Sequence, residues 1–207
     1  MSHAPWLSDK ARATVLDQIV GLEATSGAEL VVTVAVRSGH YRHADYLVGA
    51  LLSLAALLFY LFYPDPLFDD VAVMLIIASF GVGTILGASL SPLRRVFVSR
   101  KQMDEEVRKA AHSKFVEQGI SRTRDRTGIL VYVSLFEQRV EVVPDIGIPV
   151  QDLGERWASG TKALDISAKN GFAAFAQALA AMGPMLTEAV PRAPDDINEL
   201  PDDMVQA

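Results

Sequence analysis

The chain has 207 residues, of which 50% are hydrophobic, and its mean hydropathy is +0.24. These values are high for a soluble protein and predict a membrane segment. The net charge is −6, most of it in an acidic stretch after residue 190, so no basic face indicates nucleic-acid binding. The absence of cysteine excludes disulfides, thiolate catalysis and CxxC metal sites.

The amino-terminal segment predicts a cytoplasmic helix followed by a strand. Residues 1–7 lack a basic start followed by an apolar run, so they do not resemble a secretory signal peptide. Ser8 is suited to cap a helix that stops at Gly27. Residues 29–37 are dense in β-branched side chains and predict a strand. The apolar face of the helix is formed by Val15, Leu16, Ile19 and Leu22.

Two long apolar runs follow. No charged residue occurs in 46–63 or in 71–93, and each run is long enough to cross a hydrocarbon core of about 30 Å. They predict two membrane helices joined by a short connector, 64–70. The alternative is a pair of buried core helices, but two adjacent uncharged runs of this length are rare in soluble domains.

The charges beside these runs predict their orientation. Lys and Arg are absent from the connector but occur before the first run and after the second. The positive-inside rule therefore places both flanks, and with them both termini, in the cytoplasm at a bacterial inner membrane. The flanking bases are Arg37, Arg42, Arg94, Arg95, Arg100 and Lys101.

Small residues recur every four positions in the second run. Gly83 and Gly87 are central to this stripe, which also includes Ser79 and Ser91. Such a stripe lets another helix approach closely. Packing within the hairpin is the simpler interpretation, and a homo-oligomer contact through the membrane helices is the alternative.

The carboxyl-terminal half predicts a helix, a strand hairpin and further helices. Residues 101–118 form an amphipathic pattern that ends at Gly119. The unbroken apolar run 129–133 predicts a strand in mid-sheet, covered on both faces. The alternation in 139–142 predicts a partner strand nearer an edge. Two more helical stretches, 151–164 and 171–190, would cover the sheet.

The chain therefore divides into four predicted segments. The first part of one α/β domain occupies 1–44, and a transmembrane hairpin occupies 45–93. The second part of the domain occupies 94–189, and an acidic disordered tail occupies 190–207. The two domain parts must meet on one face of the bilayer.

Four segments together resemble the TPM domain family. They are 28–34 (AELVVTV), the helix end 115–120 (FVEQGI), 125–134 (DRTGILVYVS) and 139–147 (RVEVVPDIG). The family includes thylakoid lumen proteins linked to photosystem II repair and many bacterial membrane-associated proteins. The resemblance implies an α/β/α sandwich around a small mixed sheet, divalent-cation binding, and the acid phosphatase activity of some plant members. The chain departs from the usual family layout because its membrane spans interrupt the domain.

Polar residues in the turns are the candidates for chemistry. Asp125 and Asp145 lie in turns beside the central strands, with Asp152 a little beyond, and carboxylates of this kind suit Ca²⁺ or Mg²⁺. Arg124, Arg126 and Arg139 are the candidates for contacting a phosphate or a partner. The alternative is that these carboxylates are turn residues and the arginines their solvated partners.

The sequence contains no complete catalytic set. A phosphatase needs a nucleophile or a metal-activated water, and neither an Asp-x-Asp-x-Thr nor an Arg-His-Gly motif occurs. We therefore expect a membrane-anchored, cytoplasmic-facing TPM-like module that docks a protein partner or assists assembly, in contact with membrane lipid. A divalent-metal-dependent phosphatase is the alternative.

Overall fold

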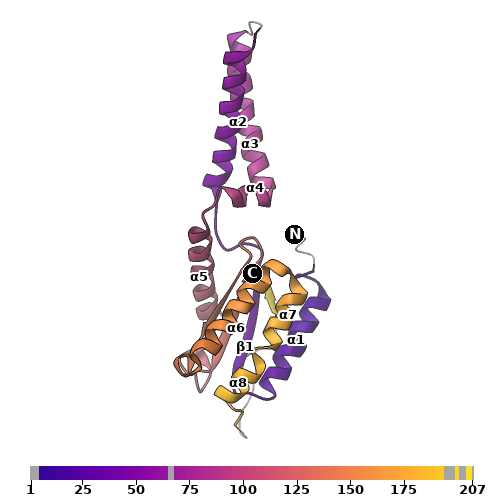
Figure 1. Ribbon diagram of the computed structural model, residues 1–207, viewed down its shortest axis with the longest axis vertical. Helices are drawn as coiled ribbons and strands as arrows, with labels where there is room; N and C mark the ends of the chain where they lie inside the picture. Colours follow the sequence, from indigo (N-terminus) through magenta and orange to yellow (C-terminus); the bar gives the residue numbers. More distant parts are fainter. Residues whose placement is uncertain (1–4, 65–67, 194–198, 201–203, 207) are drawn as a thin grey trace. The chain divides into compact units, whose positions relative to one another are not determined.

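The computed structural model describes residues 5–64, 68–193, 199–200 and 204–206. The chain forms two compact units (Figure 1). The α/β unit comprises Met1–Ser38 and Asp104–Ala207, and the helical unit comprises Gly39–Met103.

The helices and strands follow in this order. The α/β unit holds α1 (Asp9–Glu23), β1 (Glu29–Ala35), η1 (Ile120–Arg122), β2 (Gly128–Ser134), β3 (Arg139–Pro144), α6 (Val150–Asn170), α7 (Phe172–Ala180), α8 (Gly183–Ala189) and β4 (Met204–Gln206). The helical unit holds α2 (Arg42–Phe62), α3 (Asp69–Ser89) and α4 (Ser91–Val96). Helix α5 (Arg100–Glu117) begins in the helical unit and continues in the α/β unit.

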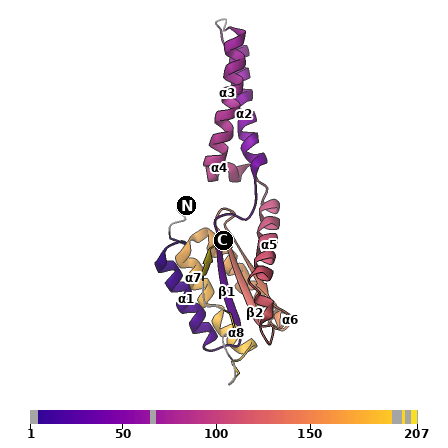
Figure 2. The same cartoon turned by 180° about the vertical axis from the view of Figure 1, so that it is seen from behind.

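A small mixed sheet forms the centre of the α/β unit, with strand order β3-β2-β1-β4. Strands β1 and β2 pair in parallel from Glu29↔Gly128 to Ala35↔Ser134, although the whole helical unit separates them in sequence (Figure 2). Strand β3 returns antiparallel to β2, and β4 lies parallel to β1. The predicted α/β class with a small mixed sheet is confirmed.

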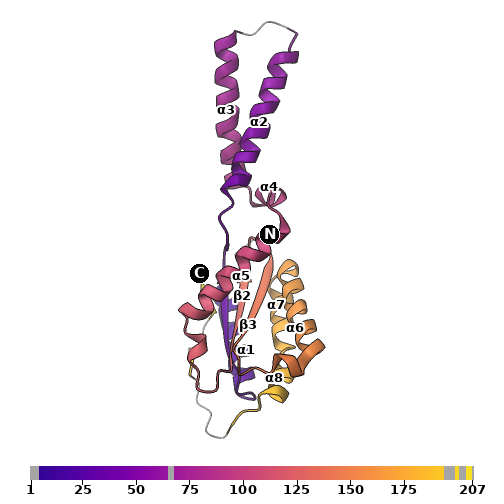
Figure 3. The same ribbon diagram turned by 90° about the vertical axis from the view of Figure 1, so that its left-hand side faces the viewer.

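Both faces of the sheet are covered by helices (Figure 3). Leu30 and Val32 belong to the larger core, with residues of α1, α6, α7 and α8. Val31 belongs to the smaller core, with Val107 and Ala111 of α5. All residues of β2 are buried, as predicted for mid-sheet, whereas in β3, at the sheet edge, only Val140 and Val143 are buried and the other residues are half-buried.

The ends of two helices test the predicted caps. The Ser8 side chain accepts a hydrogen bond from the Ala11 backbone N–H at 3.2 Å, so the predicted N-cap of α1 is confirmed. Gly119 follows α5 with φ +67°, a conformation that favours glycine. The predicted stop of α1 at Gly27 is wrong, because the helix ends at Glu23 and the Gly27 N–H binds the Val190 carbonyl instead.

The expectation of a wholly disordered tail after residue 190 is also wrong. Met204 is buried and begins β4, which pairs with β1, and Leu200 packs against the smaller core. These apolar residues are isolated among acids and form no periodic pattern, so the sequence of this segment does not predict the strand. Residues 194–198 and 201–203 lie outside the described residues.

The helical unit is an antiparallel pair of apolar helices. Both α2 and α3 have 21 residues and are long and apolar enough to cross a membrane, with mean hydropathies of 1.9 and 2.3. Only 11% and 17% of their most apolar windows are buried, so most of these side chains face outward. A core helix of a soluble protein is mostly buried, and neither helix has that character.

Close contact between α2 and α3 depends on glycine. A Cβ added to Gly83 would lie 2.8 Å from the Gly49 Cα, and one added to Gly87 would lie 3.0 Å from the Asp45 Cα. The small-residue stripe therefore packs inside the hairpin, in agreement with the simpler interpretation. At the end of the pair, the Arg94 guanidinium binds both carboxylate oxygens of Asp45, at 2.7 and 2.9 Å.

Candidate functional site

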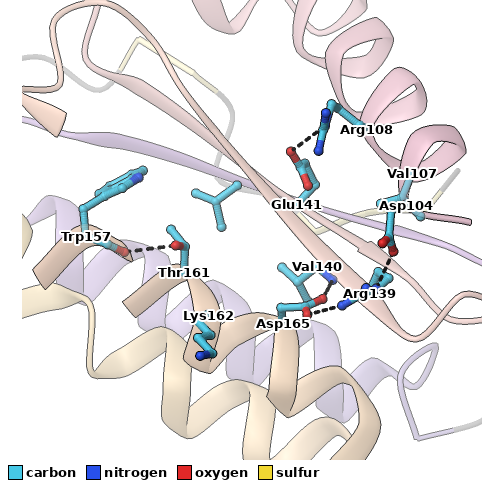
Figure 4. Close-up of a pocket in the computed structure, with 11 residues that line it drawn as sticks. Asp104, Val107, Arg108, Arg139, Val140, Glu141, Trp157, Thr161, Lys162 and Asp165 are labelled. Atoms are coloured by element: carbon cyan, nitrogen blue, oxygen red, sulfur yellow. Dashed lines mark hydrogen bonds and ion pairs between the residues drawn. The ribbon is translucent and has the colours of Figure 1, made fainter. Parts of the chain in front are cut away.

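A polar cleft of about 360 Å³ lies between α5, the edge strand β3 and α6 (Figure 4). Three carboxylates and three cations line it together with an aromatic ring and a hydroxyl. These side chains are Asp104, Arg108, Arg139, Glu141, Trp157, Thr161, Lys162 and Asp165.

Arg139 holds the two walls of the cleft together. Its Nε donates to Oδ1 of Asp104 on α5 at 2.7 Å, and its Nη1 donates to Oδ2 of Asp165 on α6 at 2.5 Å. Burial alone would lower the pKa of Arg139, but the two aspartates raise it above its ordinary value. This arginine is therefore part of the frame of the cleft, with its charge neutralised by the walls.

Glu141 has a different environment at the centre of β3. Its nearest cation is Arg108, whose Nε lies 3.9 Å from Oε1, beyond hydrogen-bonding distance. Burial raises the pKa of Glu141, and the positive charges of Arg108 and His112 offset this only in part. Glu141 is thus a carboxyl group that holds a proton more readily than an exposed glutamate.

The outer edge of β3 forms the floor of the cleft. The Val140 backbone N–H donates to Oδ1 of Asp165 at 3.1 Å, so it points away from β2. Backbone groups of an antiparallel strand alternate in direction, so the N–H and C=O of Val142 also point away from β2. The edge is closed at its far end by Pro144, which has no N–H to donate.

The remaining wall of the cleft comes from α6. Trp157 is buried against the larger core, and the Thr161 hydroxyl donates to the Trp157 carbonyl at 3.0 Å. Lys162 is exposed, and its side chain forms no ion pair with another described residue. The cleft therefore offers the exposed ammonium group of Lys162 on α6 and the half-buried carboxyl group of Glu141 on β3.

Asp145 and Arg126, both predicted as site residues, form a closed pair elsewhere in the unit. Arg126 Nε and Nη2 donate to the two oxygens of Asp145 at 2.7 and 2.8 Å, and the Ile146 N–H donates to Oδ1 at 2.8 Å. Burial opposes ionisation of Asp145, but the hydrogen bonds from Arg126 and Ile146 together lower its pKa. Both carboxylate oxygens are thus already engaged by protein donors.

The other predicted residues do not converge on this pair. The Asp125 side chain is exposed and binds its neighbour Arg124, and Asp152 is exposed near the start of α6. Arg139 lies at the opposite end of β3 from Asp145, roughly 20 Å away at strand spacing. The structure therefore does not bring these candidates together.

A Ca²⁺ or Mg²⁺ ion does not fit the predicted carboxylates as a shared site. Within the described ranges, no group of three His, Cys, Asp or Glu side chains is arranged to hold a metal. Asp145 would also have to release Arg126 before it offered an oxygen to a cation. Metal binding stays a prediction from the family resemblance.

The sequence pattern named Arg139 as a candidate contact for a phosphate or a partner, but it did not predict the helix side chains that line the cleft with it. Asp104, Lys162 and Asp165 lie on amphipathic helices, where charges ordinarily mark a solvated face. A signal was present in β3 itself, because Arg139 and Glu141 alternate with valines. Charges on an edge strand flanked by helices must meet side chains of those helices.

The α/β unit thus has a small mixed sheet and an edge cleft, and comparison with known proteins supports the fold alone. No family model matches the chain, and no curated protein matches it. The chain is similar to the NMR structure of the BA42 protein from the psychrophilic bacterium Bizionia argentinensis, with a TM-score of 0.58 and 15% identity. The likeness covers 98% of this chain and 96% of that one.

Proposed function

We propose that the chain is a membrane-anchored docking module, with a TPM-like α/β domain at the cytoplasmic face of a bacterial inner membrane. One observation carries the proposal: α2 and α3 form an apolar pair whose side chains mostly face outward. A lipid environment accommodates such a surface, whereas water does not.

The place of the hairpin in the chain supports anchoring as its role. It lies between β1 and β2, which are neighbours in the sheet, so insertion would tether the α/β unit through both ends of the hairpin. Ionisable residues inside a span are the usual mark of an intramembrane pathway. The interiors of α2 and α3, residues 46–62 and 71–89, contain no Asp, Glu, Lys, Arg or His.

The edge strand supports docking of a protein partner in the cleft. An extended segment added beside β3 would pair with the outward N–H and C=O of Val142, as in other cases of strand addition. Its side chains would meet Glu141 on one side and Lys162 on the other. The occupant that fits is therefore an extended peptide carrying both a basic and an acidic residue.

The metal-dependent phosphatase stays the alternative, and the geometry favours it less. Arg126 and Arg139, two of the cations proposed for phosphate, are engaged by aspartates. Hydrolysis of a phosphomonoester by the purified chain with added Mg²⁺, lost in Asp145→Asn with the fold intact, would contradict the docking proposal.

Photo-crosslinking tests the docking cleft directly. A benzophenone amino acid placed at Lys162 should give a discrete adduct with a partner in membranes. The same probe at Lys169 is the matched control, because Lys169 is also exposed on α6 but does not line the cleft. Val142→Pro should abolish the adduct, because it removes an outward N–H and no ladder bond to β2. Fluorescence of Trp6 and Trp157, both in the core of the α/β unit, monitors folding. Equal adducts at both positions, or an adduct that survives Val142→Pro in a folded protein, would contradict docking at this edge.

A further inference from the structure

The charges of the helical unit are separated between its two ends. Helices α2 and α3 are antiparallel, and 21 residues of helix span roughly 32 Å. Asp69 and Asp70 begin α3 beside the connector. The opposite end, where α2 begins and where α4 and the first residues of α5 follow α3, carries the bases Arg42, Arg94, Arg95, Arg100 and Lys101.

The single acid at the basic end is already neutralised. Asp45 is buried and receives both hydrogen bonds from Arg94, whose Nη2 also donates to the Ala88 carbonyl at 3.0 Å. Asp45 therefore cannot offset the other bases. The acidic residues of α5 begin only at Asp104, outside the helical unit.

Three bases of this end are exposed and available. The side chains of Arg42, Arg100 and Lys101 form no ion pair within the described residues. Guanidinium and ammonium groups bind phosphate oxygens strongly. Next to a membrane span, such bases attract anionic lipid headgroups, each contributing about 1 kcal/mol near the surface.

We propose that Arg42, Arg100 and Lys101 form a binding surface for the phosphate headgroups of anionic phospholipids. This inference rests on the proposed insertion of α2 and α3 into the membrane and goes beyond it, because insertion requires no preference among lipids. The surface selects anionic lipid over zwitterionic lipid and is separate from the cleft at β3.

Lipid binding by the full chain in mild detergent tests the inference. Phosphatidylglycerol and phosphatidylcholine with the same acyl chains are added in turn, and native mass spectrometry measures the bound lipid. The wild type should prefer phosphatidylglycerol by about ten-fold or more. The variant R42Q/R100Q/K101Q should lose this preference, and added salt should weaken it in the wild type.

A matched variant separates the surface from general charge. K10Q/R122Q/K169Q removes the same charge from exposed positions of the α/β unit that lie outside the cleft, and it should keep the preference. Equal loss of the phosphatidylglycerol preference in both triple variants, or no preference in the wild type, would overturn the inference. Displacement of the lipid by equimolar glycerol 3-phosphate would also overturn it, because it would indicate a site for soluble phosphates. Circular dichroism confirms that the helices persist. Labelling of the hairpin connector decides insertion separately, so failure of lipid selection and failure of anchoring are distinguishable.

Discussion

Arg126 and Asp145 join the loop before β2 to the loop after β3 through two charge-assisted hydrogen bonds of 2.7 and 2.8 Å. Arg126 adopts φ +59°, and its carbonyl accepts the Gly147 N–H at 2.8 Å. The pair thus fixes an unfavourable backbone conformation at the end of the sheet.

Removing the buried charge should destabilise the α/β unit. We expect Asp145→Asn to lower the free energy of unfolding by about 1.5–3 kcal/mol, the usual range for hydrogen bonds to a charged group. Asp125→Asn, in an exposed carboxylate, should change it by less than about 0.5 kcal/mol. Denaturant unfolding followed by Trp6 and Trp157 fluorescence compares the two, and equal losses would contradict the structural role of the pair.

The same pair predicts a pH dependence. The pKa of Asp145 is lowered in the folded state from its ordinary 3.8, so ionised Asp145 stabilises the fold above that pH. This stabilisation is lost as the pH falls through the lower folded pKa. As the pH is lowered, the free energy of unfolding should therefore fall less steeply in Asp145→Asn than in the wild type. The same pH dependence in both proteins would argue against a stabilising role of ionised Asp145.

The pH dependence of stability that Glu141 causes should have the opposite sign to that of Asp145. Burial raises its pKa from 4.5, so the folded state disfavours the ionised form, and stability falls as the pH rises from 4.5 through the folded pKa. We expect Glu141→Gln to stabilise the unit at neutral pH by roughly 0.5 kcal/mol, a small effect because about a third of the side chain is exposed. Glu155→Gln on α6 is the exposed control, and destabilisation by Glu141→Gln would show that the Arg108 contact outweighs burial.

Packing of the hairpin can be tested with two glycines of the same helix. Gly83→Leu should separate α2 from α3, because a Cβ there already approaches the Val48 carbonyl to 2.9 Å. Gly81→Leu should be tolerated, because nothing lies within 4 Å of its Cβ position. The aggregation temperature in mild detergent should fall only for Gly83→Leu. If size-exclusion chromatography instead showed a dimer that Gly83→Leu converts to a stable monomer, the stripe would be an oligomer contact.

Local patterns predicted much of the fold, and their failures have physical causes. The burial of β2, the edge position of β3 and the Ser8 cap follow from side-chain periodicity and local hydrogen bonding. Strand β4 was missed because its three residues gain stability only by pairing with β1, more than 160 positions earlier in the chain.

The candidate site was harder to predict than the fold. Arg139 was named as a candidate for contacting a phosphate or a partner, but its ion-pair partners Asp104 and Asp165 lie on two helices, α5 and α6, that are distant from it in sequence. Asp145 and Arg126 were chosen as separate candidates for metal and phosphate, whereas the structure pairs them. Residue type indicated charge in both cases, and only tertiary packing determined whether that charge was neutralised.

Single-cysteine labelling tests the central claim, that the hairpin crosses the membrane with the α/β unit in the cytoplasm. The chain has no native cysteine, so Asp70→Cys at the connector and Asp125→Cys in the α/β unit each give one reporter at an exposed position. In intact spheroplasts, a membrane-impermeant maleimide should label Asp70→Cys at once and Asp125→Cys only after permeabilisation. Labelling of both positions from the same side would mean that α2 and α3 do not cross the membrane.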